Sequence, residues 1–186
     1  MRIIICLTGM PGAGKTVVSE IAKKMGIPTI SMGDIIREEA EIRSIEPTSN
    51  NLGWLMMELR EKMGANIVAL RCIEKIERIK SDKILIEGVR NIEEIKEFKN
   101  IGKVTIIAVH ASPKTRFKRL IDRGRKDDPK TWEEFEKRDF RELEVGIGKV
   151  IALADKVIIN EGTLEELERI TFKTLEEVVK AHENNN

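Results

Sequence analysis

The segment RIIICLTGMPGAGKTVVSE, at the start of the chain, constrains the fold more than any other. An apolar, β-branched run stands directly before a glycine-rich segment, and an amphipathic stretch, Lys15–Met25, follows. The glycine-rich part fits the pattern G-x-x-x-x-G-K-[ST], whose backbone N–H groups turn inward around phosphate oxygens. A strand, this loop and a helix form the opening unit of a parallel α/β sheet. We therefore expect a phosphate site at the carboxyl end of the first strand.

The residue types within this loop have separate tasks. Lys15 is placed to reach the β- and γ-phosphates of a nucleoside triphosphate, and the Thr16 hydroxyl to coordinate Mg²⁺. The helix that begins at Lys15 adds the positive end of its dipole. We predict that ATP binds to the residues of the loop: Gly9, Met10, Pro11, Gly12, Ala13, Gly14, Lys15 and Thr16.

The rest of the chain alternates short apolar runs with longer amphipathic stretches. Continuous apolar runs are typical of parallel strands that are covered by helices on both faces. Strands are predicted at Ile3–Leu7, Thr29–Ser31, Lys83–Ile86, Val104–Val109 and Lys156–Ile159. Helices are predicted at Lys15–Met25, Gly53–Ile79, Ile92–Phe98, Pro113–Arg123, Trp132–Glu144 and Leu164–Ala181. The expected fold class is α/β, with three layers and a five-stranded parallel sheet between helices.

The chain has 186 residues, 41% of them hydrophobic, which suits one substantial core and a single domain over residues 1–186. Two segments, about 34–81 and about 123–139, are too long for plain connections. Both are expected to stand as lobes above the carboxyl edge of the sheet, where ligands of such folds bind. The polar tail Asn184–Asn186 is expected to fray.

Composition excludes several classes of function. The formal net charge of +1 gives no general footprint for nucleic acid or membrane. No apolar run reaches transmembrane length, and the first one is too short for a signal peptide, so a cytoplasmic location is expected. Cys6 and Cys72 lie in apolar contexts, so we expect small buried residues in a reducing compartment. His110 and His182 are assigned no catalytic role.

The ends of the second and third predicted strands carry a resemblance. They read Ser31-Met32-Gly33-Asp34, followed by Arg37, and Glu87-Gly88-Val89-Arg90. In these motifs the chain resembles the adenylate-kinase group of nucleotide kinases, with dephospho-CoA kinases as close relatives. The resemblance covers most of the chain, and it is closest to an uncharacterised archaeal family of adenylate-kinase-related proteins.

The resemblance implies transfer of the ATP γ-phosphate to a nucleoside monophosphate, with AMP as the leading acceptor. It implies that Glu87, together with Thr16, serves the magnesium ion. The lobe 34–81 is then the acceptor lobe, and the segment 123–139 is a lid. The acceptor site that it implies consists of Ser31, Gly33, Asp34, Arg37, Gly88, Arg90 and Glu94.

Arginines cluster where the lid is expected. Arg116, Arg119 and Arg123 share one helical face, and Arg125 follows at once. Phosphoryl transfer needs positive charge around both phosphates, and a lid excludes water. Arg119 is assigned to ATP, and the catalytic residues are Lys15, Arg90, Arg123 and Arg125. For Arg116, Arg119 and Arg123, a solvated basic face is the alternative. Arg138 or Arg141, on the following helix, is a further candidate for the lid, and a surface helix is the alternative there.

Three departures from the family concern the base of the acceptor. Met32 replaces a threonine near the adenine, and Val89 replaces a Phe-Pro pair, which shortens that loop. Adenylate kinases read adenine with a glutamine, whereas this chain has Glu94 there and contains no glutamine. A carboxylate only accepts hydrogen bonds, so looser base selection is predicted. The alternative is that Glu94 is a solvated helix carboxylate beside Glu93.

Two other functions stay open. A dephospho-CoA kinase-like enzyme would phosphorylate a ribose hydroxyl, with Asp34 as the base. A regulatory or assembly ATPase would couple nucleotide binding to closure on RNA or protein. Stimulation of ADP release by a small acceptor, as opposed to RNA, separates these classes.

Overall fold

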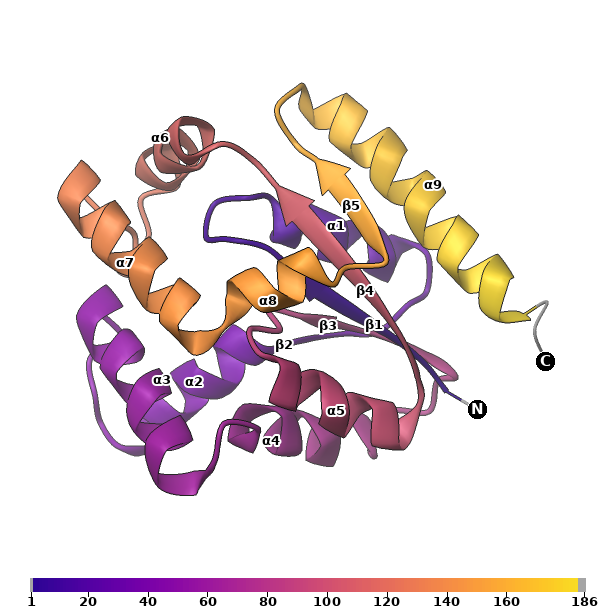
Figure 1. Ribbon diagram of the computed structural model, residues 1–186, viewed down its shortest axis with the longest axis horizontal. Helices are drawn as coiled ribbons and strands as arrows, with labels where there is room; N and C mark the ends of the chain where they lie inside the picture. The colour runs from indigo at the N-terminus through magenta and orange to yellow at the C-terminus, as the bar shows by residue number, and fades with distance from the viewer. Residues whose placement is uncertain (1, 184–186) are drawn as a thin grey trace.

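The computed structural model describes residues 2–183, so the prediction for Asn184–Asn186 lies outside the described residues. Five parallel strands form a central sheet in the order β2-β3-β1-β4-β5 (Figure 1). The strands are β1 (Ile3–Thr8), β2 (Thr29–Ser31), β3 (Lys83–Glu87), β4 (Lys103–His110) and β5 (Lys156–Ile159). The predicted α/β class and the five-stranded parallel sheet are confirmed.

Strand register brings the carboxyl ends of the strands together. Leu7, near the end of β1, stands opposite Glu87, and Glu87 stands opposite Ser31 at the end of β2. Because all strands are parallel, the loops that follow them emerge at the same edge of the sheet. The phosphate loop therefore lies beside the end of β3, and the end of β2 lies one strand further along the same edge.

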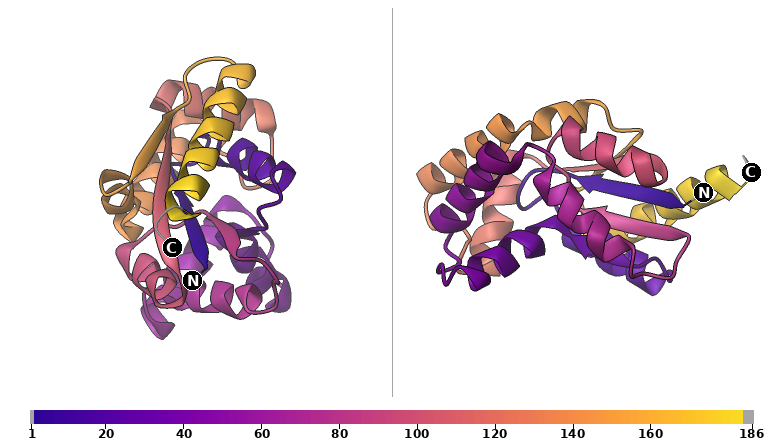
Figure 2. Two further views of the ribbon diagram at one scale, coloured as in Figure 1. Left: turned by 90° about the vertical axis from the view of Figure 1, so that its right-hand side faces the viewer. Right: turned by 90° about the horizontal axis from the view of Figure 1, so that it is seen from below.

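Helices cover both faces of the sheet (Figure 1; Figure 2). On one face, α1 (Lys15–Lys24) and α9 (Leu164–Glu183) share a core with Ile5 and Leu7. On the other, α4 (Ile67–Ile76), α5 (Ile92–Ile101) and α8 (Ile147–Ala152) share a core with Ile4 and Cys6. Alternate residues of a strand point to opposite faces, which explains why β1 is buried along its whole length. Cys6 and Cys72 are both buried, as predicted.

The acceptor lobe differs from its prediction. The single helix expected over 53–79 is two helices, α3 (Ser49–Met63) and α4, which are separated at Gly64. Gly64 has a φ of 101°, a conformation that ends a helix and favours glycine. No helix was expected directly after β2, yet α2 (Met32–Ile42) begins there because the Ser31 side chain caps Asp34 N. The short helix α8 was not predicted either.

The second long segment connects two helices that were predicted. The helices are α6 (Pro113–Arg123) and α7 (Trp132–Val145), and the residues between them form the connection 124–131. α7 packs against α3 of the acceptor lobe. Among the described residues, no helix is long and apolar enough to cross a membrane.

Candidate active site

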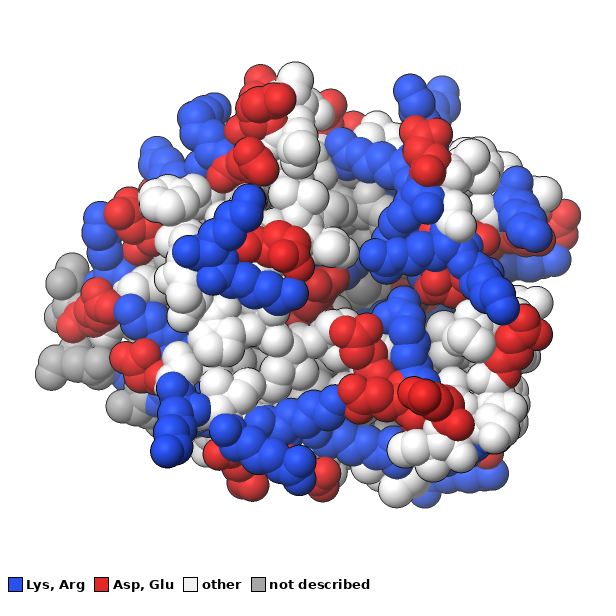
Figure 3. Space-filling model, turned by 180° about the vertical axis from the view of Figure 1, so that it is seen from behind, with Lys and Arg blue, Asp and Glu red and all other residues white. Residues whose placement is uncertain are grey.

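A cleft of about 480 Å³ opens at the carboxyl edge of the sheet. On the face seen in Figure 3, Lys and Arg side chains gather around a hollow. The cleft brings together most of the predicted site residues, namely Pro11, Gly12, Gly14, Lys15, Thr16, Ser31, Gly33, Asp34, Arg37, Glu87, Gly88, Arg90, Arg119, Arg123 and Arg125. Gly9, Met10 and Ala13 belong to the loop but do not line the cleft. Segments far apart in the sequence thus meet at one site.

The phosphate loop needs its glycines for two reasons. Gly9, Gly12 and Gly14 have φ values of 145°, 80° and 107°, which side-chain-bearing residues rarely adopt. A Cβ at Gly12 would also lie 2.7 Å from the Arg116 carbonyl oxygen. The loop therefore lies close against α6, and its backbone is free of side chains on the inner side.

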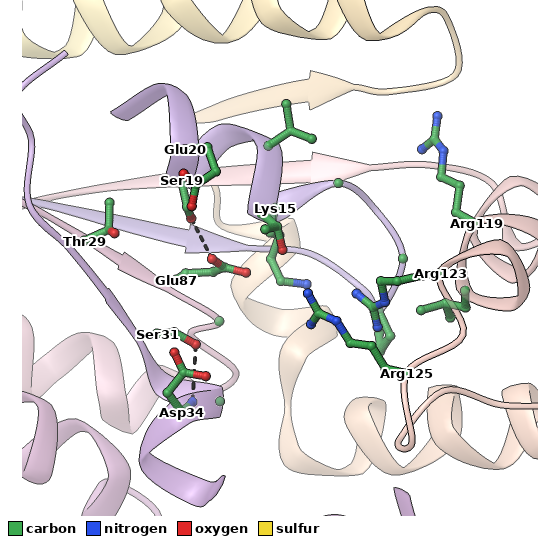
Figure 4. Close-up of a pocket in the computed structure, with 18 of the residues that line it drawn as sticks. Lys15, Ser19, Glu20, Thr29, Ser31, Asp34, Glu87, Arg119, Arg123 and Arg125 are labelled. Atoms are coloured by element: carbon green, nitrogen blue, oxygen red, sulfur yellow. Dashed lines mark hydrogen bonds between the residues drawn. The ribbon is translucent and has the colours of Figure 1, made fainter. Parts of the chain in front are cut away.

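Lys15 lies at the centre of the cleft. Its Nζ donates hydrogen bonds to the carbonyl oxygens of Gly9, at 2.6 Å, and Met10, at 3.2 Å. Burial lowers the pKa of Lys15 to about 8, although the nearby Glu87 acts in the opposite direction. In Figure 4, Lys15, Arg123 and Arg125 point into the same space, as groups that bind one phosphate would.

Glu87, at the end of β3, faces α1. Ser19 Oγ donates a hydrogen bond of 2.6 Å to Glu87 Oε2 (Figure 4), and Thr16 lines the same cleft. Mg²⁺ prefers one or two carboxylates together with substrate phosphates and water. No group of three or more His, Cys, Asp or Glu side chains able to hold a metal is found within residues 2–183. Thr16 and Glu87 fit an ion that arrives with a nucleotide.

The arginines of the cleft that follow β2 and β3 already have carboxylate partners. Arg37 pairs with Asp34 at 2.9 Å and with Asp127 at 3.3 Å. Arg90 pairs through Nε with Glu142 at 2.7 Å and donates to the Gly88 carbonyl oxygen at 2.9 Å. These contacts fix the guanidinium groups before any ligand arrives.

Two buried carboxylates in this network were not recognised in the sequence. Burial alone would raise the pKa of Glu142, but the charges of Arg90 and Arg138 hold it below its ordinary value. Burial acts likewise on Asp128, and Arg123 outweighs it through a bidentate hydrogen bond. Glu142 stands one helical turn after Arg138, a spacing that could have indicated that the charge of Arg138 acts on Glu142.

Arg138 and Arg141, the two further candidates for the predicted lid, lie in different places. Arg138 lines the cleft, where it donates to the Asp127 carbonyl oxygen at 2.7 Å. Arg141 lies outside the cleft, in a smaller cavity beside it. Of the two candidates, only Arg138 therefore lines the cleft that contains the phosphate loop.

Arg119 lies apart from the other lid arginines in Figure 4. It donates to the backbone oxygen of Asn160 at 3.0 Å and to Asn160 Oδ1 at 3.2 Å. The amide Nδ2 of Asn160 in turn donates to the Ala13 carbonyl oxygen at 2.8 Å. Asn160, directly after β5, thus connects Arg119 to the phosphate loop, a role that the sequence did not indicate.

Glu94 is the predicted site residue that the structure contradicts. It is fully buried, its Oε2 accepts a hydrogen bond from Arg90 N at 2.7 Å, and its Oε1 pairs with Arg60 at 2.5 Å. The prediction that Glu94 reads the acceptor base is wrong, and so is the alternative of a solvated carboxylate. Glu94 instead completes the capping box of α5 with Asn91, a pattern that Asn-x-x-Glu before an apolar run could have indicated.

The fold and this cleft define a P-loop kinase. A family model described as "AAA domain" matches residues 8–136. A UPF0200 protein of Hyperthermus butylicus is 53% identical over 167 residues, which cover 90% of each chain. The chain belongs to the UPF0200 family, and the predicted resemblance to an archaeal P-loop kinase family is confirmed.

Two solved structures share the fold. A shikimate kinase from Bacteroides thetaiotaomicron has a TM-score of 0.63 and 17% identity, over 96% of this chain and 98% of that one. The structure titled TT1252, from Thermus thermophilus, has a TM-score of 0.64 and 21% identity, over 95% and 97%. At this level of identity, the likeness concerns the fold alone.

Nucleotide binding is expected to take up a proton above pH 8. The pKa of Lys15 in the free protein lies below its ordinary value, at about 8, so Lys15 loses its proton as the pH rises through that value. Phosphate oxygens favour the charged amine and raise its pKa again, so binding takes up a proton and weakens as the pH rises further. Calorimetry of ATP binding in two buffers of different ionisation enthalpy, above and below that pH, measures the uptake.

Lys15→Arg is the control for this measurement, because an arginine stays charged across the whole range. Its complex is expected to show no proton uptake above pH 8. The same uptake in the wild type and in Lys15→Arg would assign the titration to another group.

Proposed function

We propose that the protein transfers the γ-phosphate of ATP to a small acceptor that carries a phosphate group, with AMP as the leading candidate. One observation supports this most strongly. The cleft joins a phosphate loop to Arg37 and Arg90, which follow two different strands and face the same space. Phosphoryl transfer consists mostly of positioning and charge neutralisation, and this arrangement offers positive groups to both phosphates.

Each side chain then has a task set by its place. Lys15 holds the γ-phosphate of the donor, and Arg123 and Arg125 neutralise the charge on the transferring group. Arg119 contacts the donor nucleotide beside the phosphate loop. Bound Mg²⁺, held by Thr16 and Glu87, would neutralise charge on the β- and γ-phosphate oxygens. Closing of segment 123–139 would exclude water from the site.

The acceptor phosphate competes with carboxylates already present. To bind Arg37 and Arg90 in a bidentate way, it must share them with Asp127 and Glu142. A phosphate dianion can do so because it carries more charge than a carboxylate. Glu94 is fully buried and cannot contact the acceptor base. The proposal of AMP therefore rests on its phosphate group alone, and any selection of the base depends on other residues.

A hydroxyl acceptor, as in dephospho-CoA kinases, is the second candidate. Asp34 supports it, because its side chain is 62% exposed and lines the same cleft as the phosphate loop. A carboxylate in that place can accept the proton of an attacking hydroxyl. AMP would need no such base.

The test is acceptor-dependent ADP formation. ADP release from ATP·Mg²⁺ is measured with AMP, GMP, CMP, UMP, dephospho-CoA or single-stranded RNA, and the phosphorylated product is identified by mass spectrometry. A phosphorylated monophosphate supports the proposal, and phosphorylated dephospho-CoA supports the second candidate. ADP release that RNA stimulates without a phosphorylated product would indicate a regulatory ATPase and overturn both.

Arg37→Ala and Arg90→Ala are each expected to weaken transition-state stabilisation by about 2–4 kcal/mol, mainly through the acceptor. Each removes a guanidinium that is placed to contact the acceptor phosphate, so KM for the acceptor should rise while ATP affinity changes little. Steady-state kinetics and ATP titration measure the two effects. Equal damage to ATP affinity would put these arginines on the donor side.

Two controls separate binding from folding in that experiment. Arg90→Ala leaves the buried Glu142 without its ion-pair partner, which could destabilise the fold. The double variant Arg90→Ala, Glu142→Gln is therefore measured beside it. Arg78→Ala changes an exposed arginine outside the cleft and should alter neither constant.

A further inference from the structure

A second cavity, of about 60 Å³, adjoins the cleft on the side of α3. Its near wall also belongs to the cleft and includes Arg37, Arg90 and Arg138. Its far wall includes Arg141 from α7, Asp127 from the connection 124–131, and Ser49, Gly53 and apolar side chains from α3. The cavity therefore continues from the acceptor end of the cleft toward the acceptor lobe.

Arg141 differs from the arginines of the near wall. Arg37, Arg90 and Arg138 each have carboxylate partners, whereas no ion pair of Arg141 is found within the described part of the chain. Its Nε is buried and has no hydrogen-bond acceptor there, and its NH2 group reaches Ser49 Oγ only at 3.4 Å. Burial lowers the pKa of Arg141 below its ordinary value. The nearby Glu142 acts in the opposite direction but makes no ion pair with it. A partly buried cation without an ion pair is costly to keep.

The chain makes room for this arginine at a further cost. Gly53 lies inside α3, where glycine is less favourable than alanine. A Cβ at Gly53 would overlap the guanidinium group of Arg141, so only glycine lets it rest on the helix backbone. Two independent features, an unpaired guanidinium and the glycine beneath it, thus point to the same place.

Charge and size define what would fit there. Four arginines line the cavity, against the carboxylates of Asp127 and Glu142, so positive charge is in excess. A cavity needs a volume of about 10–15 Å³ to hold one water molecule. The second cavity therefore has room for a group of only a few atoms. A carboxylate or phosphate is of that size and accepts two hydrogen bonds from a guanidinium.

We propose that Arg141, with Ser49, binds a second anionic group of the acceptor. The acceptor would then carry two anionic groups, one held by Arg37 and Arg90 and the other by Arg141. This inference rests on the proposed phosphoryl transfer, since it names the class of acceptor for the same site.

Matched pairs of compounds test the inference by binding, without any turnover. AMP is compared with adenosine 3′,5′-bisphosphate, and glycerol 3-phosphate with 3-phosphoglycerate, by calorimetry at one ionic strength. In at least one pair, the member with the second anionic group is expected to bind about tenfold more tightly. Arg141→Met should remove that preference. Equal binding within both pairs, no binding of any of the four compounds, or a preference that survives in Arg141→Met would overturn the proposal.

Thermal stability separates this role from a structural one. Arg141→Met removes an unpaired charge but keeps the bulk of the side chain, so the free protein is expected to melt at a higher temperature. A lower melting temperature would indicate that Arg141 serves the fold and would overturn the proposal. Gly53→Ala, which displaces the guanidinium, should also lose the ligand preference.

Arg60→Met is the matched control. Arg60 also has a buried Nε without an acceptor among the described residues, but its NH2 group pairs with Glu94. Its replacement is expected to lower the melting temperature and to leave the ligand preference unchanged. A further outcome is that inorganic phosphate stabilises the wild type but not Arg141→Met, while neither pair of compounds shows a preference. That result would assign the cavity to a free anion and overturn the assignment to the acceptor.

The inference and the proposed function can fail separately. A preference for the doubly anionic compounds without phosphoryl transfer would keep the binding site and refute the kinase. Phosphoryl transfer with equal affinity for acceptors that carry one anionic group and for acceptors that carry two would keep the kinase and refute the role of Arg141.

Discussion

Lys15→Ala is expected to lower kcat/KM for phosphoryl transfer by on the order of 10³-fold, which is about 4 kcal/mol of transition-state stabilisation. Among residues 2–183, the amine of Lys15 donates hydrogen bonds only to the carbonyl oxygens of its own loop. Its loss therefore removes positive charge from the phosphate site and leaves the two cores intact. The measurement is steady-state kinetics with saturating acceptor, beside a thermal melt that should be unchanged. Lys24→Ala, an exposed lysine on the same helix, is the control. Normal turnover by Lys15→Ala would refute the assignment of the phosphate loop.

Glu94→Ala is expected to lower the free energy of unfolding by about 3–5 kcal/mol, because it breaks a buried ion pair and leaves Arg60 without its partner. The same change removes the acceptor for Arg90 N at the start of α5. For a chain of this size, the melting temperature should fall by on the order of 10 °C.

Glu93→Ala is the matched control for that variant. Glu93 is the exposed neighbour of Glu94 on the same helix, so its loss should change stability by less than about 0.5 kcal/mol. Chemical denaturation of both variants gives the two values. A specificity change in Glu94→Ala without a loss of stability would bring back the hypothesis that Glu94 faces the acceptor base.

The parts of the site that could be predicted are those with a local pattern. The strand, the glycine loop and the lysine of GMPGAGKT lie within one short segment, so their geometry follows from neighbouring residues. Asp34, Arg37, Glu87 and Arg90 could be placed because each follows a strand, and parallel strands end at one edge. The carboxyl edge of the sheet was therefore readable from the order of the apolar runs.

The parts that could not be predicted depend on contacts between distant segments. Glu94 was placed by its distance from Arg90, but the structure pairs it with Arg60, which lies 34 residues earlier in the chain. The partner of Arg37 on the lid side, Asp127, is 90 residues away. A sequence pattern shows which charges are present. Only the packing of the helices, such as α3 against α2, α4 and α7, decides which of these charges meet.

Asn160 connects the outer edge of the sheet to the phosphate loop and helps to fix the conformation of that loop. It follows β5, which is separated from β1 by β4, yet its side-chain amide holds the loop at Ala13. Val157 and Ile159 on the same strand are more than half exposed, so substitutions there can be absorbed at the surface. A substitution of Asn160 would instead remove the hydrogen bond to Ala13 and so alter the conformation of the phosphate loop, two strands away in the sheet. The edge strand β5 is thereby coupled to the phosphate loop at the carboxyl end of β1 through one side-chain amide.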